Sequence, residues 1–119
     1  MNHKVAVIIL ADNEGFEGMG RVVNALELVK ECKVAGTPVK LVFDGAGTKW
    51  IGELSKPDHR MHALYTEVRD RVTGACSYCA TAFQVDKSVR ASEVTLISEF
   101  DAHPSILRLI NDGYQVVTY

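Results

Sequence analysis

The stretch that most constrains the fold is Lys4–Leu10 (KVAVIIL), a nearly continuous run of apolar residues rich in β-branched side chains. A run without alternating polar positions is typical of a parallel strand that is buried on both faces of its sheet. Parallel strands need long connections, which helices usually provide. Further strands are expected at Val39–Phe43, Val72–Ala75, Val94–Ile97 and Gln115–Tyr119.

Helical patterns lie between these runs. Apolar residues recur at helical spacing from Met19 to Val29, and Gly36 marks the end of that helix. A second apolar stripe runs from Met61 to Val72. Shorter helices are expected at Thr48–Leu54, after Cys76, and at Pro104–Asp112.

The alternation of strands and helices predicts one α/β domain over residues 1–119. Its sheet should be mostly parallel, with about five strands and with helices on both faces. In such sheets functional side chains collect beyond the carboxyl ends of the strands. The loops at those ends are Asp12–Gly20, Asp44–Gly47, Gly74–Cys79 and Ser98–His103.

Composition and charge exclude several function classes. The chain has 119 residues, of which 47% are hydrophobic and 24% charged, as in an ordinary globular domain. A net charge of −2 gives no basic field, so nucleic acid is not expected as a partner. No apolar run reaches the roughly 20 residues that cross a bilayer, and the early start of the first strand leaves no room for a signal peptide. We therefore expect a cytoplasmic protein without a membrane partner.

Two thiols, Cys76 and Cys79, follow the small residues at Gly74–Ala75, where a helix is expected to start. Unpaired N–H groups and the helix dipole favour a thiolate at such a place. We therefore expect Cys76 to be the more reactive thiol, with Cys79 near enough to attack it or to form a disulfide. The alternative is that both are small buried hydrophobic residues. Cys32, on the apolar side of the first long helix, is expected to contribute only packing.

Histidines offer a metal alternative. His59 and His62 are three residues apart, and with Cys76 and Cys79 they would complete a Cys₂His₂ zinc set. However, the two pairs stand in the reverse of the zinc-finger order, and the core stripe of their helix directs both histidines to the side. We therefore expect a solvated helix face, no stoichiometric zinc and no other cofactor. His103 either approaches the thiols or caps the following helix.

Several segments resemble the DsrE/DsrF-like family of small sulfur-relay proteins, which includes the TusD and YchN-type proteins. The resemblance runs nearly from end to end. Its most specific element is the cysteine that follows the third strand and precedes a helix. The other matching segments are KVAVIIL, Asn24–Glu27, VFDGAG and HPSILRLINDGYQVVTY.

The resemblance implies a flavodoxin-like three-layer fold, here as a single DsrE-like domain over residues 1–119. It also implies that Cys76 is the sulfur-carrying cysteine, which forms a persulfide and passes the sulfur to a partner. Cys79 corresponds to a second cysteine that only some branches of the family have. Members assemble as trimers or hexamers, and their relay chemistry needs no cofactor.

Our leading hypothesis is therefore a sulfurtransferase of the persulfide-carrier type, with sulfur donor and acceptor proteins as its partners. One alternative is a thiol–disulfide redox or sensor protein that uses Cys76 and Cys79. Another is a non-enzymatic ligand-binding or assembly module.

A homotrimer or homohexamer is also expected. Large aromatic residues lie in or beside connections rather than in the strand runs, and a subunit interface would cover them. These residues are Phe16, Trp50, Phe83 and Phe100.

Overall fold

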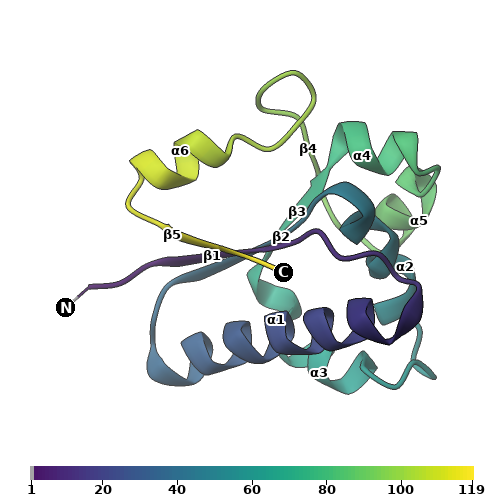
Figure 1. Cartoon of the computed structure of the whole chain (residues 1–119), viewed down its shortest axis with the longest axis horizontal. Helices are drawn as coiled ribbons and strands as arrows, with labels where there is room; N and C mark the ends of the chain where they lie inside the picture. The colour runs from purple at the N-terminus through teal and green to yellow at the C-terminus, as the bar shows by residue number, and fades with distance from the viewer. Residues whose placement is uncertain (1) are drawn as a thin grey trace.

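The computed structural model describes residues 2–119 and confirms the α/β fold. A five-stranded sheet, parallel throughout, forms the middle of a flavodoxin-like three-layer arrangement (Figure 1). The strands stand in the order β4-β3-β2-β1-β5. They are β1 (Val5–Ile9), β2 (Val39–Phe43), β3 (Val72–Cys76), β4 (Leu96–Ile97) and β5 (Gln115–Thr118).

Strand β1 behaves as its unbroken apolar run predicts. It pairs with β2 on one side and β5 on the other, so it is not an edge strand. Val7 and Ile9 belong to the main hydrophobic core, whereas Ala6 and Ile8 belong to a second core on the opposite face. Both faces of β1 are therefore buried.

The long helix α1 (Gly15–Ala35) packs its apolar stripe on the sheet. Val22, Leu26 and Val29 are fully buried along that stripe. The helix ends where expected, because Gly36 takes a left-handed conformation with φ of 74° and its N–H donates to the carbonyls of the last turn. Cys32 is only 6% exposed within this packing, so its predicted place in the core is confirmed.

The shorter helices match the expected positions less closely. Of the stripe from Met61 to Val72, only His62–Val68 forms an α-helix; a 3₁₀ turn follows over Arg69–Arg71, and Val72 begins β3. The last helix begins at Ile106 rather than at Pro104, with Ser105 as its cap. Helix α5 was not expected, and β4 is shorter than the Val94–Ile97 that we predicted. The helices are α2 (Trp50–Leu54), α3 (His62–Val68), α4 (Ser77–Ala82), α5 (Asp86–Ala91) and α6 (Ile106–Asn111), with 3₁₀ turns η1 (Gly45–Lys49) and η2 (Arg69–Arg71).

The two faces of the sheet are covered unequally. Figure 1 shows α1 and α3 together on one face and α6 on the other. The main core lies under α1, α2 and α3, while the smaller core beneath α6 is built around Ile8, Val42 and Leu109. No helix within residues 2–119 combines the length and apolar character that a membrane crossing requires.

The aromatic residues expected near the surface divide into two groups. Phe16 and Phe100 are 89% and 69% exposed, and Phe83 is also exposed. Trp50 contradicts the expectation, because it is only 1% exposed and is fully part of the main core. Its indole N–H donates to the Ala11 carbonyl at 2.9 Å, which gives the ring a polar partner inside the domain.

Candidate functional site

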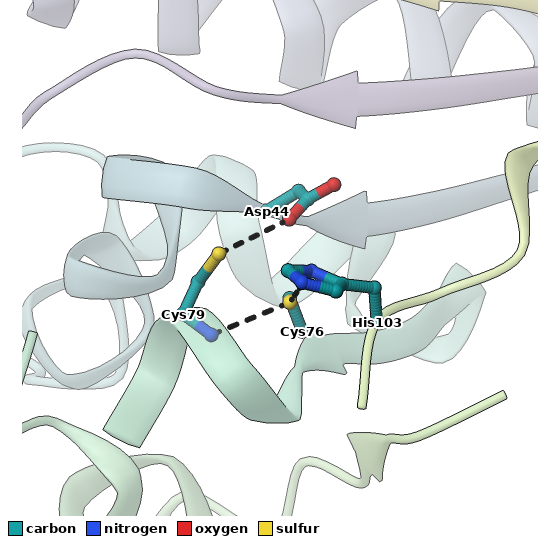
Figure 2. A group of neighbouring side chains, drawn as sticks. All are labelled: Asp44, Cys76, Cys79 and His103. Carbon is teal, nitrogen blue, oxygen red and sulfur yellow. Dashed lines mark hydrogen bonds between the residues drawn. The ribbon is translucent and has the colours of Figure 1, made fainter. Parts of the chain in front are cut away.

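Four side chains with acid–base, nucleophilic or metal-binding chemistry meet at the carboxyl ends of the strands (Figure 2). Asp44 directly follows β2, Cys76 ends β3, Cys79 lies in α4, and His103 lies in the loop after β4. One ligand atom from each of the four lies within 4.8 Å of the others. Three of the expected loops therefore converge, as parallel strands that end at one edge require.

Cys76 lies at the corner between strand and helix. The backbone reaches this corner through Gly74, where a Cβ atom would lie 2.5 Å from the Thr95 carbonyl oxygen of the neighbouring chain segment. The Cys76 side chain is fully buried and caps α4, since its Sγ accepts the Cys79 N–H at 3.4 Å.

The Cys76 thiol is not acidified by its helix. Burial raises its pKa to about 12, and the nearby Asp44 charge adds to the rise, although the Cys79 N–H acts in the opposite direction. The expectation that the helix start lowers the pKa of Cys76 is therefore wrong for the free thiol. The helix has six residues, and its single N–H contact does not offset the loss of solvation.

Cys79 is the more accessible of the two thiols, because its side chain is only partly buried. Its Sγ donates to Asp44 Oδ1 at 3.6 Å (Figure 2). The same carboxylate oxygen accepts the Gly45 N–H at 2.8 Å and so caps η1. Asp44 is thus held in place by its own turn while it faces Cys79.

His103 approaches the thiols, which decides between the two roles expected for it. Its Nδ1 lies 3.2 Å from Cys76 Sγ, and the tautomer decides which group donates. Helix α6 is capped instead by Ser105, whose side-chain oxygen accepts the Arg108 N–H at 3.2 Å.

A tight turn positions the imidazole. Phe100 and His103 exchange two backbone hydrogen bonds, of 2.9 and 2.8 Å, across the pair Asp101–Ala102. Both turn residues have positive φ, 47° and 66°, which is the geometry of a two-residue hairpin turn. The Ala102 carbonyl accepts the Tyr78 N–H at 2.9 Å, and the Tyr78 ring packs against the imidazole at 4.8 Å between centroids.

His59 and His62 do not join the thiols. His59 Nδ1 accepts the Met61 N–H at 3.1 Å, and its ring meets Trp50 edge-on. His62 Nδ1 lies 2.8 Å from the Leu54 carbonyl oxygen. In the part of the chain that the structure describes, the ligand cluster at Cys76 includes neither histidine.

Asp44 is the site residue that the sequence reasoning missed, although its loop was placed at the correct edge. The available signal was its position: an acidic residue directly after β2, the strand that pairs with the cysteine-bearing β3. The adjacent loop Asp12–Gly20 contributes no side chain to the cluster, and Asp12 instead forms an ion pair with Lys49 at 2.9 Å.

Comparisons with known proteins support the fold. No protein-family model matches the chain. It is 24% identical over 115 residues to the uncharacterized protein MJ0733 of Methanocaldococcus jannaschii, covering 96% of this chain and 93% of that protein. The structure is similar to that of BT1422, a conserved protein of unknown function from Bacteroides thetaiotaomicron. That similarity has a TM-score of 0.65 at 16% identity and covers 96% of this chain and 94% of the other.

Proposed function

We propose that this chain is a sulfur-relay protein, in which Cys76 carries sulfane sulfur as a persulfide and passes it to a partner thiol. The observation that carries the proposal is the contact of 3.2 Å between Cys76 Sγ and His103 Nδ1, with the second thiol of Cys79 beside it. A buried thiol is a poor nucleophile unless a base stands within reach of its proton. His103 is that base.

Loading is a single displacement. The neutral His103 imidazole accepts the Cys76 proton, and the thiolate attacks the outer sulfur of a donor persulfide, R–S–SH. The donor S–S bond breaks, Cys76–S–SH forms, and the donor leaves as R–S⁻, which regains a proton from His103. No electrons are gained or lost overall, so the step needs no redox cofactor.

Delivery reverses this chemistry. An acceptor thiolate attacks the outer sulfur, which becomes the acceptor persulfide, and Cys76 leaves as a thiolate. When no acceptor arrives, the Cys79 thiolate attacks the inner sulfur of Cys76–S–SH. This forms the Cys76–Cys79 disulfide and releases HS⁻, so Cys79 clears sulfur that has not been delivered.

The donor and acceptor are proteins that reach the site at its exposed rim. Two large side chains at this rim are exposed, those of Tyr78 and Phe100. The Tyr78 ring packs on the His103 ring, and Phe100 pairs with His103 through the backbone. Because the Cys76 side chain has no exposed surface, a partner must displace part of this rim to reach the sulfur. This restricts the persulfide to chosen partners. We place the chemistry in the cytoplasm, where thiols are kept reduced.

A homotrimer or homohexamer is part of the same proposal. Phe16, Phe83 and Phe100 all expose large ring surfaces, which solvent accommodates poorly. Subunit contacts would cover them and narrow the access to Cys76. Light scattering coupled to size exclusion tests this, since a species of 13.1 kDa at micromolar concentration contradicts the oligomer.

Intact mass spectrometry tests the function. The reduced protein is exposed to a small-molecule persulfide donor with the donor's thiol as control. We expect a gain of about 32 Da, one sulfur atom, in the parent and in Cys79→Ser. Cys79→Ser should hold the added sulfur longer, because it cannot form the disulfide. An unchanged mass in every folded variant contradicts the relay.

A second candidate function is thiol–disulfide exchange, which the closeness of the two thiols favours, since their Sγ atoms lie within 4.8 Å. In that case the donor would cause a loss of about 2 Da in the parent without any persulfide, even at the earliest times. The order in which the gain of about 32 Da and the loss of about 2 Da appear over time therefore separates the two candidate functions.

A further inference from the structure

The four converging side chains form a donor set that the sulfur chemistry uses only in part. They offer two thiol sulfurs, one imidazole nitrogen and one carboxylate oxygen. Tetrahedral zinc has bonds of about 2.0 to 2.3 Å, which separate its ligand atoms by about 3.3 to 3.8 Å. The contacts Cys76–His103 at 3.2 Å and Cys79–Asp44 at 3.6 Å are close to that spacing, and all ligand atoms lie within 4.8 Å.

Three of these four side chains are already held in place by the fold. Cys76 is held by the Cys79 N–H, and Asp44 by the Gly45 N–H. His103 is held by its tight turn and by the Tyr78 ring. Ligands that are placed before a metal arrives lose little freedom on binding it.

The charge around Asp44 points to a cation. Among residues 2–119, no lysine, arginine or histidine nitrogen forms an ion pair with its carboxylate. Lys49, the last residue of the 3₁₀ turn that Asp44 caps, forms an ion pair with Asp12 instead. Within the described chain, residues 2–119, the partly buried carboxylate therefore faces two thiols without a positive partner.

We propose that this cluster binds one Zn²⁺ through Cys76 Sγ, Cys79 Sγ, His103 Nδ1 and an oxygen of Asp44. On binding, each thiol loses one proton to the solvent, and the imidazole nitrogen and a carboxylate oxygen each supply a lone pair. Two thiolates with nitrogen and oxygen suit a borderline metal such as zinc, whereas Mg²⁺ and Ca²⁺ prefer oxygen alone.

Zinc and sulfur compete for the same atoms. A Cys76 thiolate bound to zinc cannot attack a donor persulfide, because its lone pair is engaged by the metal. Conversely, a Cys76 persulfide ends in a second sulfur atom, which no longer lies where the four ligand atoms converge. The zinc site does not depend on the relay function. Our expectation of no stoichiometric zinc rested on His59 and His62, which do lie elsewhere, but His103 and Asp44 complete a different set.

Co²⁺ titration of the full, reduced chain tests the site, with Zn²⁺ then used to displace the cobalt. We expect one metal ion per chain and a near-ultraviolet band from thiolate-to-cobalt charge transfer. Cys79→Ser should lose about half of that band and bind about 100-fold more weakly or worse. His103→Gln should lose about 10- to 100-fold in affinity, and Asp44→Asn about 10-fold.

Matched controls carry the same residue types elsewhere in the fold. Cys32→Ser, His59→Gln and His62→Gln should bind within about twofold of the parent. Circular dichroism establishes which variants are folded. Should Cys76→Ser fail to fold, the partly buried Cys79 and Asp44 positions still decide the outcome.

The proposal is overturned if the folded, reduced parent shows no charge-transfer band. It is equally overturned if Cys79→Ser and His103→Gln bind as the parent does, or if a control variant loses the metal. Sulfur loading is not measured here, so failure of the zinc site leaves the relay to its own test.

Discussion

The chain places cysteine and histidine in two regions, and the fold treats them differently. At the strand ends, Cys76 and His103 lie in contact, with Cys79 and Asp44 beside them. On the side of α1 and α3, Cys32, His59 and His62 each serve packing or a backbone hydrogen bond. Burial raises the thiol pKa of both Cys32 and Cys76, so burial alone does not separate the regions.

What separates them is convergence. Parallel strands all end at one edge of the sheet, so residues that are far apart in sequence are brought together there. Asp44 and His103 meet the cysteines in this way across β2, β3 and β4. A side chain on a helix contacts only its neighbours on the same helix face and the element that packs against that face. Residue type thus identifies candidates, while position relative to the strand ends decides which of them act together.

The largest effect should come from removing the central thiol. Cys76→Ser should abolish sulfur loading, at least about 100-fold below the parent rate, because serine cannot form a persulfide. Cys32→Ser should load as the parent does. Loading is followed by mass spectrometry over time, and a Cys32 variant that is folded but inactive would remove the distinction between the regions.

Histidine substitutions in the two regions should differ almost as strongly in their effect on the loading rate. His103→Gln should slow loading by about 100-fold, because it removes the base beside Cys76 while keeping similar volume. His59→Gln and His62→Gln should leave the rate unchanged. Equal rates in all three variants would show that the 3.2 Å contact between Cys76 and His103 has no chemical role.

Gly74→Ala should disturb the strand-end region through the backbone. Its Cβ would come within 2.5 Å of the Thr95 carbonyl oxygen and 2.6 Å of an Ile97 side-chain carbon. Because β4 leads into the His103 loop, we expect a loss of about 2 to 4 kcal/mol in unfolding free energy together with slower loading. Urea denaturation measures the first effect. Gly20→Ala, where the added atom meets nothing within 4 Å, is the control.

The region of α1 and α3 should respond in stability only. Cys32→Ala removes a small buried side chain and should cost about 1 kcal/mol, with sulfur loading intact. Urea denaturation and loading are measured on the same sample. Lost loading in the folded variant would mean that Cys32 takes part in the chemistry.

The smallest expected effect is at the turn that carries His103. Ala102 has φ of 66°, a conformation that glycine adopts more readily. Ala102→Gly should therefore raise the unfolding free energy by about 0.5 to 1 kcal/mol. Thermal unfolding checks this, and a lower melting temperature would show that the turn is not strained.

Much of this architecture could be predicted from the sequence. The unbroken run at β1 and the Gly36 stop of α1 are local signals, and the structure confirms both. The strand-to-helix corner at Cys76 was also placed correctly. Short elements were harder, because α5 and β4 depend on tertiary contacts more than on their own periodicity.

The site was only partly predictable for a similar reason. The thiol pair is close in sequence, so its spacing revealed it. Asp44 and His103 lie 32 and 27 positions from Cys76, and only the order of the strands and the turn at Asp101–Ala102 bring them together. The raised pKa of Cys76 also depends on burial, which the sequence around the helix start did not reveal.

The most direct test of the central claim identifies which cysteine carries the added sulfur. The reduced, metal-free parent receives less than one equivalent of a persulfide donor, is alkylated and digested, and the cysteine peptides are fragmented in a mass spectrometer. We predict sulfane sulfur on Cys76, a Cys76–Cys79 disulfide that appears only later, and none on Cys32. Sulfur on Cys32 as often as on Cys76, or a disulfide that forms without any earlier persulfide, would contradict the account.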